Sequence, residues 1–190
     1  MSNVDSILDS SSEAYYDPAV DFSGVMPEGS YKAYATELTL KEDLVVRSKY
    51  LADVYEVTFE IAEENSDYTY EKDGKEVSGK AFVGKKLRSK GFFRFKKPNP
   101  ETYPALEENS GSNKSYMELV ESFGIELEED EEGRFFLPSV DESDIVGVPV
   151  IIDVYHSNWT DNENKERTTP RAGSIFKWDG QKRRLKDLPF

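Results

Sequence analysis

The segment ADVYEVTFEIA, residues 52–62, is the clearest strand in the sequence and decides the class of fold that we expect. Hydrophobic side chains occupy every second position from Tyr55 to Ile61, and Glu56, Thr58 and Glu60 stand between them. Because successive side chains of a strand point to opposite faces of a sheet, this period of two predicts a half-buried strand.

Further strands are predicted on both sides of this segment. Residues 29–40 (GSYKAYATELTL) show an imperfect alternation of the same kind. Residues 68–77 contain Asp73-Gly74 between β-prone flanks, which is typical of a tight hairpin. Residues 82–95 form a third main strand, which ends before two nearby prolines.

A helix and two more strands are predicted in the second half of the chain. Residues 113–123 place apolar side chains at helical spacing, and a glycine follows where a helix commonly ends. Residues 144–155 (DIVGVPVIIDVY) are the most apolar stretch and predict a core strand. The polar composition of residues 157–169 predicts a loop, and the last strand is predicted at residues 172–178.

The order of these elements predicts a mainly β fold. We expect an OB-fold-like five-stranded barrel with one helix between strands 3 and 4, and an extra hairpin between strands 2 and 3. Residues 26–180 would form this nucleic-acid-binding domain. Residues 1–25 predict a flexible acidic N-terminal tail, and residues 181–190 a C-terminal tail.

The chain of 190 residues has no cysteine and a formal net charge of -14. The lack of cysteine excludes disulfides, thiolate metal sites and a cysteine nucleophile, and it fits a cytoplasmic setting. We expect neither a signal peptide nor a membrane span, because no apolar run is long enough. The negative charge taken alone argues against nucleic acid, because phosphate binding needs cations.

The charge is very uneven along the chain. Residues 80–97 (KAFVGKKLRSKGFFRFKK), here called the basic segment, hold eight of the 24 cations and none of the 38 acidic residues. In a strand, one face would be mostly apolar: Leu87, Ser89, Gly91, Phe93 and Phe95. The other face would carry five cations and one ring: Lys86, Arg88, Lys90, Phe92, Arg94 and Lys96. Cations attract phosphates and a flat ring stacks on a base, so this second face is the predicted single-stranded nucleic-acid site.

Two other interpretations of the basic segment stay open. Its cations can form a solvated outer face that pairs with Glu56 and Glu60 on the neighbouring strand. Alternatively, a bulge at Gly91 would swap the two faces beyond it, and Phe93 and Phe95 would then be the stacking rings.

Four more aromatic residues are candidates for the same groove, namely Tyr55, Trp159, Phe176 and Trp178. Core packing is the preferred interpretation for Tyr55 and Phe176. Trp178 stands beside Lys177 and before a basic run, so we include it among the predicted stacking residues.

No catalytic or metal-binding pattern stands out. The single histidine, His156, has no second histidine with which to form a zinc site. Nucleophile-elbow, glycine-rich phosphate-loop and EF-hand patterns are absent from the sequence. We therefore expect no enzyme activity, no cofactor and no metal.

Several short motifs occur in the order in which a known family has them. They are MPEGSY at residues 26–31, VTFE at 57–60, LVESFG at 119–124 and DIVG at 144–147. Over residues 26–155 the chain resembles a bacteriophage family that is usually found in replication modules and is regarded as single-stranded-DNA-binding-like. The resemblance implies binding of single-stranded DNA in replication or recombination, in the cytoplasm of an infected bacterial host.

The last four residues, Asp187, Leu188, Pro189 and Phe190, resemble the Asp-Ile-Pro-Phe tip of bacterial single-stranded DNA-binding proteins. In that family the terminal phenylalanine and its carboxylate dock on replication and repair proteins, so the resemblance implies a partner-binding tip. The approach to the tip departs from the family, because residues 182–186 are basic.

Two functions follow from the sequence. The first is a phage-type single-stranded DNA-binding protein that coats exposed strands with little sequence specificity, while acidic residues at 1–24 or 126–132 cover its groove when DNA is absent. The alternative is an acidic interaction protein, either a DNA mimic or a phage structural component, which binds a protein partner. The net charge of -14 motivates the alternative, and the basic segment is what it leaves unexplained.

Overall fold

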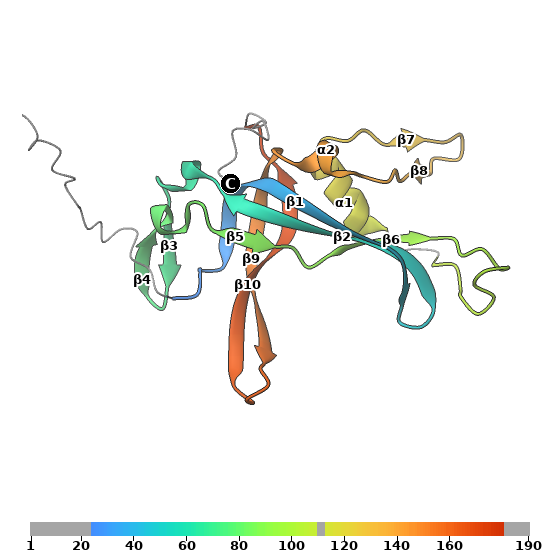
Figure 1. The fold of residues 1–190 in the computed structure, drawn as a ribbon. Helices are drawn as coiled ribbons and strands as arrows, with labels where there is room; N and C mark the ends of the chain where they lie inside the picture. Colours follow the sequence, from blue (N-terminus) through green and yellow to red (C-terminus); the bar gives the residue numbers. More distant parts are fainter. Residues whose placement is uncertain (1–23, 110–112, 181–190) are drawn as a thin grey trace, which may run out of the picture.

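The computed structural model of the protein describes residues 24–109 and 113–180 (Figure 1). Most of the two predicted tails, and the predicted partner-binding tip at residues 187–190, lie outside the described residues. No helix in the described part of the chain is long and apolar enough to cross a membrane.

Six strands of the described residues form one antiparallel sheet, and the protein is mainly β, as predicted. The strands are β1 (Gly29–Val46), β2 (Tyr50–Ile61), β5 (Lys86–Arg88), β6 (Phe92–Lys96), β9 (Pro149–Thr160) and β10 (Glu166–Lys177). Their order across the sheet is β10-β9-β1-β2-β5, and β6 also pairs with β2.

The two edges of this sheet meet at one point. Ser89, which follows β5, forms a single parallel bridge with Ala172 of β10. The hydroxyl of Ser89 accepts a hydrogen bond from the amide of Val57 at 2.9 Å, which ties the bridge to β2. No continuous ladder joins the two edges within the described residues, so the sheet is not a closed barrel.

Short elements connect the main strands. A hairpin of β3 (Thr69–Lys72) and β4 (Lys75–Ser78) turns at Asp73-Gly74, as its turn signal predicts. Single 3-10 turns at Glu63–Asn65 and Gly79–Phe82 flank this hairpin.

The helix α1 (Lys114–Ser122) lies in the chain between β6 and β9, where a helix is predicted. Gly124 follows the end of the helix, and its φ of 72° falls in the left-handed region that a glycine adopts without strain. The helix packs against β6 and against β10, the strand that contains Ala172 of the bridge (Figure 1).

Four stretches differ from the prediction. One is the predicted strand at 82–95, which is divided into β5 and β6. The predicted strand at 144–155 begins only at Pro149, because Asp141 caps a short helix, α2 (Glu142–Ile145), before it. The acidic stretch at 126–132 includes β7 (Glu128–Glu129), which pairs with β8 (Phe135–Phe136) in a small hairpin. The polar stretch at 157–169 is not a loop, because β9 and β10 continue through most of it as a paired hairpin.

The hydrophobic core lies between the inner face of the sheet and α1. Tyr55, Val57, Phe59 and Ile61 of β2 are buried in it, as their alternation predicts. The ring of Tyr116 on α1 lies 4.8 Å from that of Tyr55, between centroids. Burying side chains of this size stabilises a fold by roughly 1.5–3 kcal/mol each.

A bulge at Gly91 separates β5 from β6. Arg88 stands opposite Thr58 of β2, and Phe92 stands opposite Tyr55, so four steps along the basic segment match three along β2. Gly91 has a φ of 81°, and a Cβ there would lie 3.2 Å from a methyl carbon of Val54. The extra residue reverses which side chains face outward beyond it.

Candidate nucleic-acid interface

Before the bulge, the cations of the basic segment lie on the outer face of the sheet. Lys86, Arg88 and Lys90 are exposed, and Leu87 and Ser89 between them are buried. Arg88 Nη1 lies 3.9 Å from Glu56 Oε2, a long contact, and Lys41 Nζ lies 2.7 Å from the other oxygen of the same carboxylate. Lys86 and Lys90 have no ion-pair partner among the described residues, so these cations are available to an anionic ligand.

Phe92 does not stack on a ligand, which corrects the prediction. Its side chain is 4% exposed and belongs to the hydrophobic core, opposite Tyr55. The reason is the bulge, since the extra residue at Gly91 turns Phe92 to the inner face of the sheet.

Arg94 and Lys96 also turn away from the outer face, so their predicted phosphate contacts are corrected as well. Arg94 donates to Asp53 Oδ2 at 3.2 Å and to the carbonyl of Leu137 at 3.1 Å. Lys96 Nζ lies 2.6 Å from carboxylate oxygens of both Asp53 and Asp43. Asp53 is buried, and a buried carboxylate needs such partners.

This carboxylate cluster also changes the proton affinity of Lys96. Burial by itself lowers the pKa of Lys96, but the hydrogen bonds to Asp43 and Asp53 outweigh it and raise the pKa above its usual value. Lys96 therefore stabilises the fold as a charged partner within a protein ion pair.

Phe93 and Phe95 take the outward places that the bulge creates. They stand opposite Val54 and Ala52 of β2, with ring centroids 6.0 Å apart and planes at 17°. The ring of Tyr50 meets Phe95 edge-on, 6.0 Å away. The bulge interpretation of the basic segment is thus the one that the structure supports, with Phe93 and Phe95 as the outward rings.

The hairpin of β9 and β10 carries a second row of aromatic and basic side chains. Tyr155 pairs with Arg171 and Trp159 with Arg167, and the spacing of two places all four on one face. Trp159 is 51% exposed, and its indole nitrogen donates to Thr169 Oγ1 at 2.9 Å. Of these four, sequence reasoning named only Trp159; the period-two pattern across 155–159 and 167–171 was the available signal.

Lys90 joins the two rows. With Asp153, Tyr155, Gly173 and Ser174 it lines a cavity of about 400 Å³. A Cβ at Gly173 would lie 3.1 Å from the Tyr155 ring, so the glycine lets this ring lie against the backbone of β10. The basic-aromatic face, as we call it, comprises Lys86, Arg88, Lys90, Phe93, Phe95, Tyr155, Trp159, Arg167 and Arg171.

Three other aromatic candidates lie elsewhere. Tyr55 is in the core, as preferred from the sequence. Trp178, a predicted stacking residue, packs 5.4 Å from the ring of Tyr34 and beneath Lys32, both on β1. After β10 the chain crosses toward β1, so the ring of Trp178 lies against β1. The basic residues that follow Trp178 in the sequence therefore do not predict the position of this ring.

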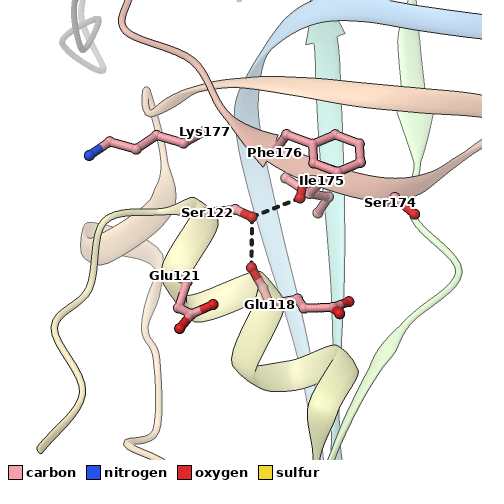
Figure 2. A pocket seen from close by; sticks show the side chains of 7 residues that line it. All are labelled: Glu118, Glu121, Ser122, Ser174, Ile175, Phe176 and Lys177. Carbon is pink, nitrogen blue, oxygen red and sulfur yellow. Dashed lines mark hydrogen bonds between the residues drawn. The ribbon is translucent and has the colours of Figure 1, made fainter.

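Phe176 is 49% exposed, so the preferred interpretation of core packing is wrong for it. It borders a hollow of about 390 Å³ between α1 and β10 (Figure 2). In this hollow Ser122 Oγ hydrogen-bonds the carbonyls of Glu118 and Ile175, and Lys177 extends from the same strand as Phe176. Ser174 borders both this hollow and the cavity that Lys90 lines, so the two adjoin.

The single histidine, His156, has hydrogen-bonding partners within the protein. His156 Nε2 lies 2.8 Å from the carbonyl of Met26, and its amide donates to Glu28. Among the described residues no group of three or more histidine or acidic side chains could hold a metal ion.

Comparisons with protein-family models, with curated proteins and with solved structures found no match to this chain.

Proposed function

We propose that the protein binds single-stranded DNA along the basic-aromatic face, as a phage-type single-stranded DNA-binding protein without catalysis. The observation that carries the proposal is the row of exposed cations on β5, flanked on both sides by outward aromatic rings. Cations hold the phosphate chain and rings stack on bases, and together they recognise single strands with little sequence preference.

The topology supports an OB-fold-like arrangement. If β5 and β6 are counted together as the third main strand, the main strands lie across the sheet in the order 5-4-1-2-3. The third strand then touches the fifth in parallel at Ser89 and Ala172. The helix α1 falls between the third and fourth strands. In OB-folds the outer face of strands 2 and 3, between the 1–2 and 4–5 loops, is the usual place for oligonucleotides, and the basic-aromatic face occupies the equivalent position.

The net charge of -14 does not oppose this function. Electrostatic attraction depends on the local field, which screening limits to about 8–10 Å at moderate salt. Lys86, Lys90 and Arg171 take part in no ion pair among the described residues, and Asp53 neutralises cations that point inward, Arg94 and Lys96.

The biological setting rests on the sequence resemblance. Its motifs resemble those of replication-module proteins of bacteriophages, which implies coating of exposed strands in replication or recombination inside an infected cell. Residues 187–190 would then recruit replication or recombination proteins.

The decisive test is a titration of a fluorescent thirty-nucleotide oligo-dT at low and moderate salt, beside a matched duplex. We expect tight, salt-sensitive binding to the single strand and weaker binding to the duplex. Lys90→Glu should weaken binding about tenfold, which corresponds to ~1.4 kcal/mol. Trp159→Ala should cost roughly 1–3 kcal/mol of stacking. Lys75→Glu and Phe135→Ala, which change exposed residues on the β3–β4 and β7–β8 hairpins, should bind as the wild type does.

A second candidate function is docking of a protein partner on the acidic hairpin β7–β8. Phe135 and Phe136 are 50% and 65% exposed there, beside the acidic residues 128–132. Absence of binding to either nucleic acid at low salt would overturn the first proposal and favour this one, and pull-down with Phe136→Ala as the control would then identify the partner.

A further inference from the structure

At the rings of β6, which belong to the basic-aromatic face, the outer surface contains a second hollow, distinct from the cavity that Lys90 lines. It measures about 310 Å³ and lies between the β1–β2 hairpin, β6 and the start of α1. Its lining consists of Val46, Arg47, Tyr50, Phe93, Phe95, Asn109 and Ser115. We propose that this hollow takes one unpaired nucleobase, and that Arg47 holds the phosphate of the same nucleotide. The inference rests on the proposed function and adds to it a base-binding site and a residue that the basic segment does not include.

The aromatic wall of the hollow suits a base. The nearly parallel rings of Phe93 and Phe95 and the edge-on ring of Tyr50 form one aromatic cluster along one side. Phe93 and Phe95 are only half-buried, although a neighbouring ring, that of Phe92, is fully packed in the core. A planar, apolar surface left partly open to water binds another flat ring by stacking, with centroids about 4.5–7 Å apart as in aromatic pairs.

Arg47 is held in a conformation that arginine rarely adopts. Its φ is 52° and that of Ser48 is 57°, in the turn that the amide of Lys49 closes on the carbonyl of Val46 at 3.1 Å. Turns with two such residues favour glycine and asparagine, because a side chain in the left-handed region strains the backbone. Arginine therefore lowers the stability of this turn, as residues at binding sites often do.

Arg47 is the one charged residue among the described residues that line this hollow. Arg47 is exposed and has no carboxylate within 4 Å among the described residues. Ser115 adds a hydroxyl at the wall, a group of the kind that contacts base edges. A cation, stacking rings and a polar group around one hollow fit a whole nucleotide rather than a bare phosphate.

A nucleobase can enter this hollow only when it is unpaired. In a duplex each base is stacked between its neighbours, and enzymes that bind a base in a pocket must first take it out of the stack. The hollow therefore explains a preference for single strands over duplexes that the cations of β5 alone do not produce, since those attract any phosphate chain.

The test compares oligo-dT with an abasic oligonucleotide of the same length, which keeps every phosphate and lacks every base. Wild-type protein should bind the abasic strand at least ~5-fold more weakly, because it loses the stacking. Phe95→Leu, which keeps an apolar side chain at this position, should weaken binding of oligo-dT and leave the abasic strand unchanged.

Arg47→Gly separates the functional role from a structural one. The glycine relieves the backbone, so thermal unfolding should occur at an equal or higher temperature. Binding should weaken about 5- to 10-fold, and the slope of log affinity against log salt should decrease by about 1. Arg47→Lys, which keeps the charge, should restore most of the affinity.

The outcomes are distinguishable. If the wild type binds neither strand, the proposed function fails. If Phe95→Leu or Arg47→Gly binds oligo-dT as the wild type does, the base site alone is overturned, and the exposed cations and Trp159 remain the explanation. If the wild type binds oligo-dT and the abasic strand equally, base stacking is overturned both in the hollow and at Trp159, and only the cations remain.

Discussion

The basic segment divides at Gly91 into two halves that have similar composition and opposite surroundings. Before the bulge, Lys86, Arg88 and Lys90 are exposed on the outer face of the sheet. After it, Arg94 and Lys96 turn toward Asp53, which lies 3.2 Å and 2.6 Å from them. One extra residue thus decides whether a cation is available to a phosphate or is neutralised by a buried carboxylate.

The difference teaches that a count of cations overstates a binding site. Exposed cations contribute to ligand binding and little to folding, whereas cations around a buried carboxylate contribute to folding, because removing one leaves a charge without its partner. Variants on the two sides of Gly91 should therefore affect different measurements.

Arg94→Ala should have the largest effect on stability. It leaves Asp53 with Lys96 as its remaining cation and frees the carbonyl of Leu137, so we expect a loss of about 3 kcal/mol in the free energy of unfolding. Lys90→Ala should change that free energy by less than ~0.5 kcal/mol, as exposed substitutions do. Urea unfolding of both variants measures the contrast. Equal, small losses would mean that the two halves are alike after all.

The bulge itself can be tested with two glycines that share a positive φ. Gly91→Ala strains the backbone and brings a Cβ to 3.2 Å from Val54, whereas a Cβ at Gly84 would meet nothing within 4 Å. We expect losses of roughly 2–3 kcal/mol at Gly91 and about 1 kcal/mol at Gly84. A larger loss at Gly84 would show that the contact with Val54 is not what fixes the bulge.

Much of the main sheet is predictable from the sequence, because apolar and polar side chains alternate along its central strand from Tyr55 to Ile61. The strand around Tyr55 and the Asp73-Gly74 hairpin follow from local pattern and turn chemistry. The position of the bulge does not, since Gly91 is compatible with either register and only the pairing of Phe92 with Tyr55 decides between them.

The other half of the candidate interface escaped prediction for a different reason. The β9–β10 hairpin extends beyond the core, so residues 157–169 bury no apolar face and resemble a loop in composition. The turn at Arg47 and Ser48 contains no glycine or asparagine and carries no turn signal. Long-range pairing, rather than local preference, holds both segments in place.

The smallest expected effect is a pH dependence confined to the inward half. The pKa of Lys96 is raised by its hydrogen bonds to Asp43 and Asp53, against the effect of burial. A raised folded-state pKa gives stability that is complete below the unfolded value, about pH 10.4, and is lost as the pH rises through the folded value. The stability difference between wild type and Lys96→Met should therefore shrink in alkaline solution.

Lys90→Met is the matched control for this measurement, because it removes an exposed lysine that has no ion-pair partner in the described chain. Burial raises the pKa of Tyr31, which destabilises every variant alike at high pH and cancels in the differences. Calorimetric unfolding from neutral to alkaline pH should show a constant difference for Lys90→Met and a decreasing one for Lys96→Met. A constant difference for both would place Lys96 among the solvated cations, and the division of the basic segment at Gly91 would then rest on Arg94 alone.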